Sequence, residues 1–204
     1  MRSFLLLLGF IILPTSLFAQ NADEMAKEIE NLYRSGAGTS ISFTLDGEKT
    51  SLSFATSTSQ FRVDMANDLI VSDGTTIWHY GKAKKEVAID KIQGKSGSLS
   101  NIEEIIKFST NYSGVLSHKG NTYELQLTPS SSISKLMESV GNISLLTFTF
   151  TKSHSGIQMK KISARSSQRN FAIGNIKIKS LTKLDPKLFT FTTPAGAKVI
   201  DLRD

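Results

Sequence analysis

The sequence predicts a mainly β protein with a few helices, in which a large antiparallel sheet or barrel carries short amphipathic helices. From Ile41 onward, apolar and polar side chains alternate with a period of two over many short runs, as in half-buried strands. Turn signals such as Asp46-Gly47 and Asp73-Gly74 separate the runs, which is typical of an antiparallel meander and not of βαβ units. Three other segments show the helical spacing of apolar residues. These helices would cover the concave face of a strongly curved sheet.

Composition limits the size of the domain and the chemistry open to it. A chain of 204 residues with 39% hydrophobic residues suits one globular domain, which we place at 20–204. The absence of cysteine excludes disulfides, thiol nucleophiles and thiolate metal sites, and three histidines leave little for a metal centre. The net charge of +6 is too diffuse to indicate nucleic-acid binding. We therefore expect no metal, no cofactor and no nucleic-acid partner.

The first 19 residues have the order of a secretory signal peptide. Met1-Arg2 is basic, Phe4 to Leu13 is almost wholly apolar, and the small Ala19 precedes the expected cleavage site. A membrane anchor is the alternative, but a spanning helix needs about 20 apolar residues and this run is shorter. We expect export to a periplasm with cleavage near Ala19. No cysteine follows that could carry a lipid anchor.

A helix is expected directly after the signal peptide. Asn21 and Glu24 have the spacing of a capping box, and Gly36 is a natural stop. The apolar residues between them fall on one stripe, at Met25, Ile29, Leu32 and Tyr33. Such a stripe must be buried against another element, and the sheet is the expected partner.

The strands follow in chain order, each identified by alternation. Their apolar positions are Leu52 and Phe54; Phe61, Val63 and Met65; Leu69 to Val71; Ile77 to Tyr80; Val87 and Ile89; Leu146, Phe148 and Phe150; and Ile176 and Ile178. Two further helices interrupt them, one near 100–106 with Ser100 and Glu103 as a capping box, the other near 133–140 ended by Gly141. The pattern leaves open whether a filled core or a cavity lies between helices and sheet.

Catalytic motifs are weak in this chain. Ser132 and Lys135 have the Ser-x-x-Lys spacing of penicillin-binding enzymes, but the companion motifs are missing and a helix start explains the serine. His79 alternates with two aromatic residues, so we expect it on the solvated face of its strand. The basic residues of 177–187 indicate another solvated face, with a membrane-docking face as the alternative. We expect no catalytic residues.

Two segments carry longer motifs. Leu69 to Tyr80 reads LIVSDGTTIWHY, and Phe189 to Asp201 reads FTFTTPAGAKVID. The first resembles a strand, Ser-Asp-Gly turn and Trp-x-Tyr signature of the LolA family, the periplasmic carriers of outer-membrane lipoproteins. The second is similar to that family's closing F-x-F-x-P-P-x-G-x-x-V-x-D. Order and spacing agree over essentially the whole mature chain.

The resemblance implies an incomplete, strongly curved antiparallel β-barrel, closed by three short helices around an apolar cavity. By resemblance, the cavity that holds acyl chains includes Phe61, Val63, Ile70, Ile106 and Ile162. Strand alternation adds four further positions, Leu52, Phe54, Phe148 and Phe150. Trp78 and Asp73-Gly74 are expected to hold the hairpin and not to touch cargo.

The same resemblance implies a function without a chemical reaction. The protein would act as a monomeric chaperone that shields the acyl chains of lipoproteins and moves them from the inner to the outer membrane. Its partners would be acylated lipoproteins, an inner-membrane ABC transporter that loads them, and an outer-membrane acceptor or the outer membrane itself. One alternative is a relative that carries another amphiphile or senses mislocalised lipoproteins. The other is a β domain with a filled core and no ligand.

One position departs from the family pattern. Family members carry an arginine that latches the helices over the cavity, and Ser57 stands at that position here. Arg62 is close in sequence, but alternation places it on the opposite strand face from Phe61. The latch is therefore absent or different, which leaves cargo control and cargo identity open.

Overall fold

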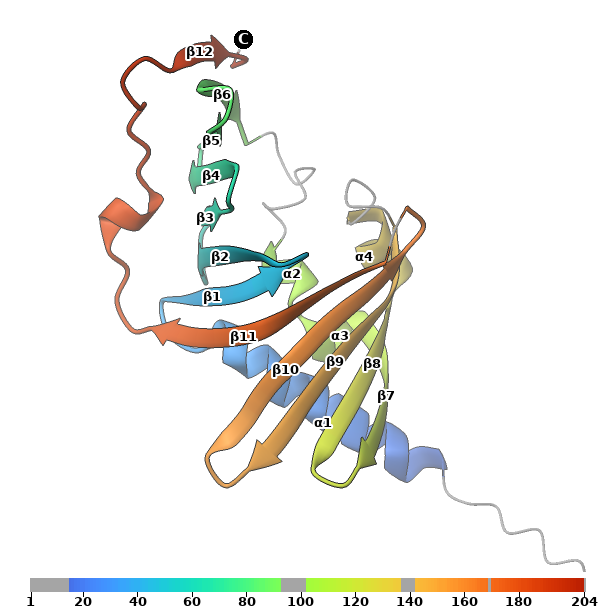
Figure 1. Ribbon diagram of the computed structural model, residues 1–204. Helices are drawn as coiled ribbons and strands as arrows, with labels where there is room; N and C mark the ends of the chain where they lie inside the picture. The colour runs from blue at the N-terminus through green and yellow to red at the C-terminus, as the bar shows by residue number, and fades with distance from the viewer. Residues whose placement is uncertain (1–14, 93–101, 137–141, 169, 204) are drawn as a thin grey trace, which may run out of the picture.

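The strands form one strongly curved sheet with helices on its concave side (Figure 1). The computed structural model describes residues 15–92, 102–136, 142–168 and 170–203, so most of the predicted signal peptide lies outside the described residues. The sheet has 12 strands within these ranges, in the order β12-β6-β5-β4-β3-β2-β1-β11-β10-β9-β8-β7. Its end strands β12 and β7 are not paired with each other, so the sheet is an open barrel. The predicted fold class is confirmed.

The strand bounds follow the alternating runs of the sequence. They are β1 Gly38–Leu45, β2 Glu48–Ala55, β3 Gln60–Asp64, β4 Asp68–Asp73, β5 Thr76–Gly81, β6 Glu86–Lys91, β7 Tyr112–Lys119, β8 Thr122–Pro129, β9 Ile143–Ser153, β10 Gly156–Ser166, β11 Phe171–Leu181 and β12 Lys198–Asp201. The hairpin turns after β1 and β4 contain Gly47 and Gly74, whose positive φ angles fit tight turns. Neighbouring strands are antiparallel except β12, which pairs with β6 in parallel. That pairing differs from the predicted all-antiparallel sheet, because the chain crosses the sheet before it forms β12.

Within the described residues the α-helices fall into three regions, as predicted. The first is α1 (Thr15–Arg34), the second combines α2 (Ile102–Ile105) and α3 (Phe108–Asn111), and the third is α4 (Ser131–Leu136). The end of the predicted 133–140 helix lies outside the described residues. No helix in the described ranges is long and apolar enough to cross a membrane.

Helix α1 lies against the concave face and buries the predicted stripe. Met25, Ile29 and Tyr33 are buried, while Leu32 at its edge is half-buried. Gly114 of β7 permits this approach, since a Cβ there would lie 3.3 Å from the Cβ of Ala22. The helix and sheet share one apolar core that extends over β7 to β11 and into β1 to β3.

The convex face of β3 to β6 has its own smaller core. It is covered by the C-terminal segment, which includes the 3-10 helix η3 (Pro186–Phe189) and runs along the outside of these strands (Figure 1). Val71, Val87 and Phe189 are fully buried there. Trp78 stacks on Phe191 with ring centroids 6.0 Å apart. The C-terminal motif therefore pins the signature hairpin from outside, in agreement with the structural role predicted for Trp78.

Candidate functional site

All nine residues predicted to line an apolar cavity lie on the concave side in one apolar cluster. Strand register explains why residues distant in sequence meet. Leu52 pairs with Val63, which pairs with Ile70, and Phe54 pairs with Phe61. In the other half of the sheet Ile162 pairs with Phe148, and Phe150 follows two residues later on the same face. Ile106 joins them directly after α2.

Burial divides the nine residues into two groups. Phe54, Phe61, Ile106, Phe148 and Phe150 are buried and belong to the packed core. Leu52, Val63, Ile70 and Ile162 are only half-buried, so their side chains remain accessible on the concave face. The second group can contact a ligand without the core opening, whereas the first group can do so only if helices move. Their role in binding stays a prediction.

Other half-buried apolar residues extend this accessible face beyond the predicted set. Those packed on the same cluster are Leu32, Phe43, Ile77, Ile105, Leu116, Tyr123, Ile157, Phe171, Ile173 and Ile178. Sequence alternation missed Phe171 and Ile173 because the alternation of inward and outward side chains shifts by one residue within β11. Odd-numbered residues of β11 face the concave side up to Ile173, and even-numbered residues do so from Ile176 onward. The switch comes at Asn175, whose φ is 52°. The sequence signal for this bulge is Gly174-Asn175, since both residue types tolerate unusual backbone angles.

The bulge also splits the sheet. β10 and β11 pair only where Lys161–Ala164 faces Phe171–Gly174. Beyond that, β10 stays with β9 and β11 stays with β1, so the two strands diverge (Figure 1). The wedge between them holds a pocket of about 420 Å³, lined by Leu32 and Ser35 at the end of α1 and by Ile157, Gln158, Met159, Ile176, Lys177, Ile178 and Ser180. The concave face is thus reachable from the side as well as from the open edge.

A polar link fastens α1 to α3 over the core. The Glu30 carboxylate accepts hydrogen bonds from the Ser109 hydroxyl at 2.7 Å and the Ser109 backbone N–H at 3.2 Å. Its other oxygen accepts from Arg34 Nη1 at 2.9 Å. Ser57, where the LolA family resemblance expects a latch arginine, is exposed in the bend between β2 and β3. Arg62 faces away from Phe61 as predicted, because it pairs with Val71 on the convex side.

Tyr33 adds a polar atom to this apolar region. Its hydroxyl is buried and makes no hydrogen bond with the described residues, and its ring packs edge-on against Phe108 at 5.9 Å. Burial raises the pKa of the Tyr33 hydroxyl well above its ordinary value, so it remains a neutral donor. A buried donor without a partner costs about 1–3 kcal/mol.

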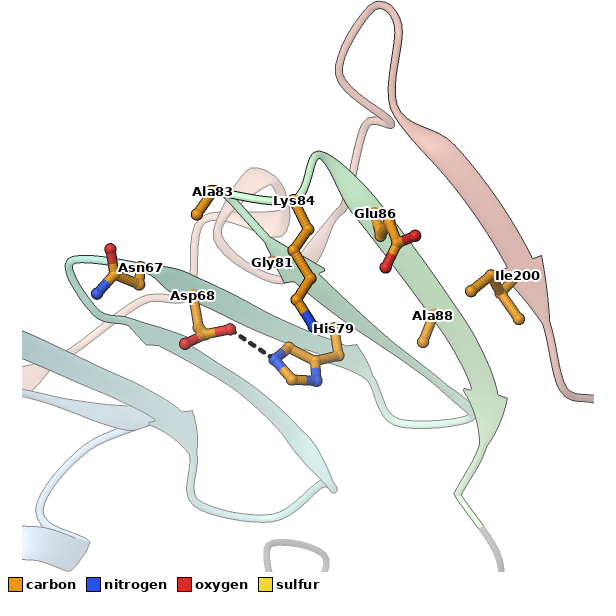
Figure 2. A pocket seen from close by; sticks show the side chains of 9 residues that line it. All are labelled: Asn67, Asp68, His79, Gly81, Ala83, Lys84, Glu86, Ala88 and Ile200. Atoms are coloured by element: carbon orange, nitrogen blue, oxygen red, sulfur yellow. Dashed lines mark hydrogen bonds and ion pairs between the residues drawn. The ribbon is translucent and has the colours of Figure 1, made fainter.

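A second pocket lies farther along the concave face, at the edge formed by β4, β5, β6 and β12 (Figure 2). It has a volume of about 350 Å³ and is lined by Asn67, Asp68, His79, Gly81, Ala83, Lys84, Glu86, Ala88 and Ile200. His79 Nε2 lies 2.9 Å from Asp68 Oδ1. His79 is exposed on the face opposite Trp78, as predicted, but it lines a pocket, which sequence reasoning missed because its neighbours come from three other strands.

Ser132 and Glu104 have ordinary surroundings in the structure. Ser132 is exposed in the first turn of α4, where its hydroxyl lies 2.9 Å from that of Ser130. Glu104 pairs with Lys107 at 2.5 Å, and this hydrogen bond lowers the pKa of the Glu104 carboxyl. Among the described residues, no three His, Asp or Glu side chains are grouped so as to hold a metal ion.

The fold and the site together define a class of protein, in which an open, curved sheet presents an accessible apolar face that helices partly cover. No family model matches the sequence, and no curated protein matches it. An uncharacterized conserved protein from Thermus thermophilus is similar in structure, with a TM-score of 0.50 and 10% identity over 89% of this chain and 99% of that chain. This likeness supports the fold alone.

Two more distant likenesses have TM-scores below 0.5. A DUF1329 family protein from Desulfovibrio piger has a TM-score of 0.41 and 12% identity, covering 85% of this chain and 97% of its own. LprF from Mycobacterium bovis has a TM-score of 0.43 and 6% identity, covering 87% and 98%. Neither supports an inference about what this chain binds.

Proposed function

We propose that the protein is a periplasmic carrier that shields the acyl chains of lipoproteins between the inner and outer membranes. The observation that carries the proposal is the accessible apolar face, where Leu52, Val63 and Ile70 form a continuous row beside a packed core. A half-buried apolar surface on the concave face of a sheet is suited to an apolar ligand. The LolA resemblance of the signature and tail motifs supports the same function.

The energetics fit a carrier that makes and breaks no bonds. Burying a long acyl chain is worth about 0.8 kcal/mol per CH₂, or on the order of 10 kcal/mol per chain. Carriage requires most of this to be recovered in the protein, and release requires that the site open at modest cost. The accessible row provides contact area, and the helices provide a cover held by few polar links such as Glu30 with Ser109. An inner-membrane ABC transporter would load the cargo, and an outer-membrane acceptor or the membrane itself would receive it.

A charge placed on the accessible row tests this function. Val63→Glu puts a carboxylate among Leu52 and Ile70, and we expect affinity for a triacylated lipopeptide to fall at least about tenfold. Val63 is preferable to Phe61, which is 1% exposed and whose replacement by an acid would disturb folding. Val115→Glu is the matched control, since Val115 is 66% exposed on the convex side of β7.

Binding is measured by titration, and thermal unfolding checks that both variants are folded. Equal lipopeptide binding by the two variants would overturn the proposal. Mass spectrometry of material that co-purifies with the protein distinguishes the second candidate, a carrier of another amphiphile. Stoichiometric lipoprotein supports the first candidate, and a free lipid supports the second, which the altered latch position Ser57 favours.

A further inference from the structure

One row of paired residues crosses half of the concave face and changes character along the way. Leu52 pairs with Val63, Val63 with Ile70, and Ile70 with His79. His79 pairs with Ala88, and Ala88 with Ile200 at the sheet edge. The first three positions belong to the apolar face, and the last three line the edge pocket. An extended molecule lying along this row would therefore meet apolar side chains at one end, and at the other end His79 and the charged residues Asp68, Lys84 and Glu86 that line the pocket.

Among the charged side chains that line the edge pocket, one lysine has no ion-pair or hydrogen-bond partner in the described residues. Asp68 is paired with His79 at 2.9 Å, and Glu86 with Lys198 at 3.5 Å. Lys84 lines the same pocket and makes no ion pair or hydrogen bond with the described residues. Figure 2 shows its side chain directed into the pocket toward His79. Each carboxylate of the pocket thus has a partner, His79 for Asp68 and Lys198 for Glu86, and the Lys84 ammonium group is the lining cation left to contact an anion.

A neighbouring lysine shows the contrast. Lys82 lies in the same turn between β5 and β6 as Lys84, but its ammonium group donates to Asp64 Oδ1 at 2.8 Å and to the Met65 carbonyl oxygen. Its charge is therefore engaged on the convex side, because Asp64 pairs with Leu69 and faces away from Val63. Lys84 is the cation that the turn presents to the concave face.

We propose that this pocket binds the anionic headgroup of the amphiphile whose acyl chain lies on Val63 and Ile70. This inference rests on the second candidate under the proposed function, a carrier of another amphiphile, because an acylated cysteine has no phosphate headgroup. It specifies the ligand: a lipid with a net negative, phosphate-like headgroup. Lys84 supplies the opposing charge, and Ala88 leaves room because its side chain is small. Ile200, 37% exposed, closes the pocket from the edge strand β12. The C-terminal motif thereby contributes a wall to the site.

The test compares two lipids of identical chain length. Lysophosphatidylglycerol has a net negative headgroup, and lysophosphatidylcholine has a zwitterionic one. The full mature protein should bind the first about tenfold more tightly, and the preference should shrink as salt is raised. Lys84→Glu should remove the preference for lysophosphatidylglycerol. Lys49→Glu is the matched control, because Lys49 is an exposed hairpin lysine on the convex face, and it should keep the preference.

The outcomes separate the headgroup pocket from the carrier function. Equal binding of both lipids, or an unchanged preference in Lys84→Glu, overturns the headgroup pocket while the carrier function stands. Failure to bind either lipid overturns the second candidate function, a carrier of another amphiphile, while the lipopeptide titration tests the lipoprotein carrier separately. In that case glycerol phosphate is titrated alone to test whether the pocket binds an anion. Binding that depends on Lys84 shows a site for a small free anion. Absence of that binding overturns the pocket as well.

Discussion

The Glu30 carboxylate on α1 accepts two hydrogen bonds from Ser109 on α3, which is 79 residues away in the chain. The side chain of Glu30 is 11% exposed, so these bonds form in a largely dry environment where they are stronger than at the surface. They join the long helix to the short helical region over the concave face. This contact fastens the two helical regions to each other over the apolar core.

Removing this link should destabilise the protein measurably. We expect Glu30→Ala to lower the free energy of unfolding by about 2 kcal/mol, because Arg34 and Ser109 lose a largely buried partner. Glu28→Ala is the matched control on the same helix, where an exposed ion pair with Lys152 is worth about 0.5 kcal/mol or less. Urea denaturation measures both, and equal losses would contradict the special role of Glu30.

The start of β1 should not tolerate a methyl group. A Cβ on Gly38 would lie 2.5 Å from the Phe54 carbonyl oxygen and 2.7 Å from Leu184 Cδ2. Since the nearer atom belongs to backbone, we expect Gly38→Ala to cost roughly 1–3 kcal/mol in unfolding free energy. Gly174→Ala, which meets no atom within 4 Å, should be neutral or slightly stabilising. Thermal unfolding of the two variants would contradict the argument if their midpoints shifted equally.

The single tryptophan reports whether the C-terminal segment is docked. Trp78 stacks on Phe191, so Phe191→Ala should expose the indole, shift its emission to longer wavelength and raise its quenching by acrylamide. Phe171→Ala, on the concave face, should lower stability and leave the emission unchanged. An unchanged spectrum in the Phe191 variant would show that the stacking does not hold the segment.

Acid should weaken the turn between β4 and β5. Burial acts to raise the pKa of Asp73, but hydrogen bonds from the Thr76 and Thr75 backbone N–H groups and the Thr75 hydroxyl outweigh it and lower the pKa. Because the folded value lies below the unfolded one, the stabilisation is complete above the ordinary carboxyl pKa of about 3.9 and is lost as pH falls through the folded pKa.

Asp73→Asn should therefore lose less stability than the wild type between pH 5 and pH 2.5, which covers about one unit on each side of that value. Thr75→Val removes one donor to the carboxylate without removing a titrating group, and it should show part of the same effect. Urea midpoints across this range measure both. Parallel curves for wild type and Asp73→Asn would contradict the assignment.

Local patterns predicted much of the fold. The stripe from Met25 to Tyr33 specified α1 and its buried face, and alternation at Leu52, Phe54, Phe61 and Val63 specified which side chains share the concave side. Both are properties of a few consecutive residues, so a sequence displays them directly. The LolA resemblance added that the barrel is incomplete.

What could not be predicted depends on partners far apart in the chain. The pairing of β12 with β6 places Lys198 beside Glu86 and brings Ile200 to the edge pocket that Asp68 and Lys84 also line. The contact of Glu30 with Ser109 depends on how two helices cross. No periodicity encodes such contacts, because each requires the finished sheet.

The central seam between β1 and β11 has a consequence for how the chain acquires its structure. Gly38 pairs with Leu181, so the middle of the sheet joins segments from opposite ends of the described chain. Strands β1 to β6 can form successive hairpins as the chain emerges, but the outer edge of β1 has no partner until residues 171–181 follow. Contacts of such long sequence separation slow folding, and an open edge invites pairing with other chains. A chain that emerges gradually would thus remain prone to aggregation until residues 171–181 arrive.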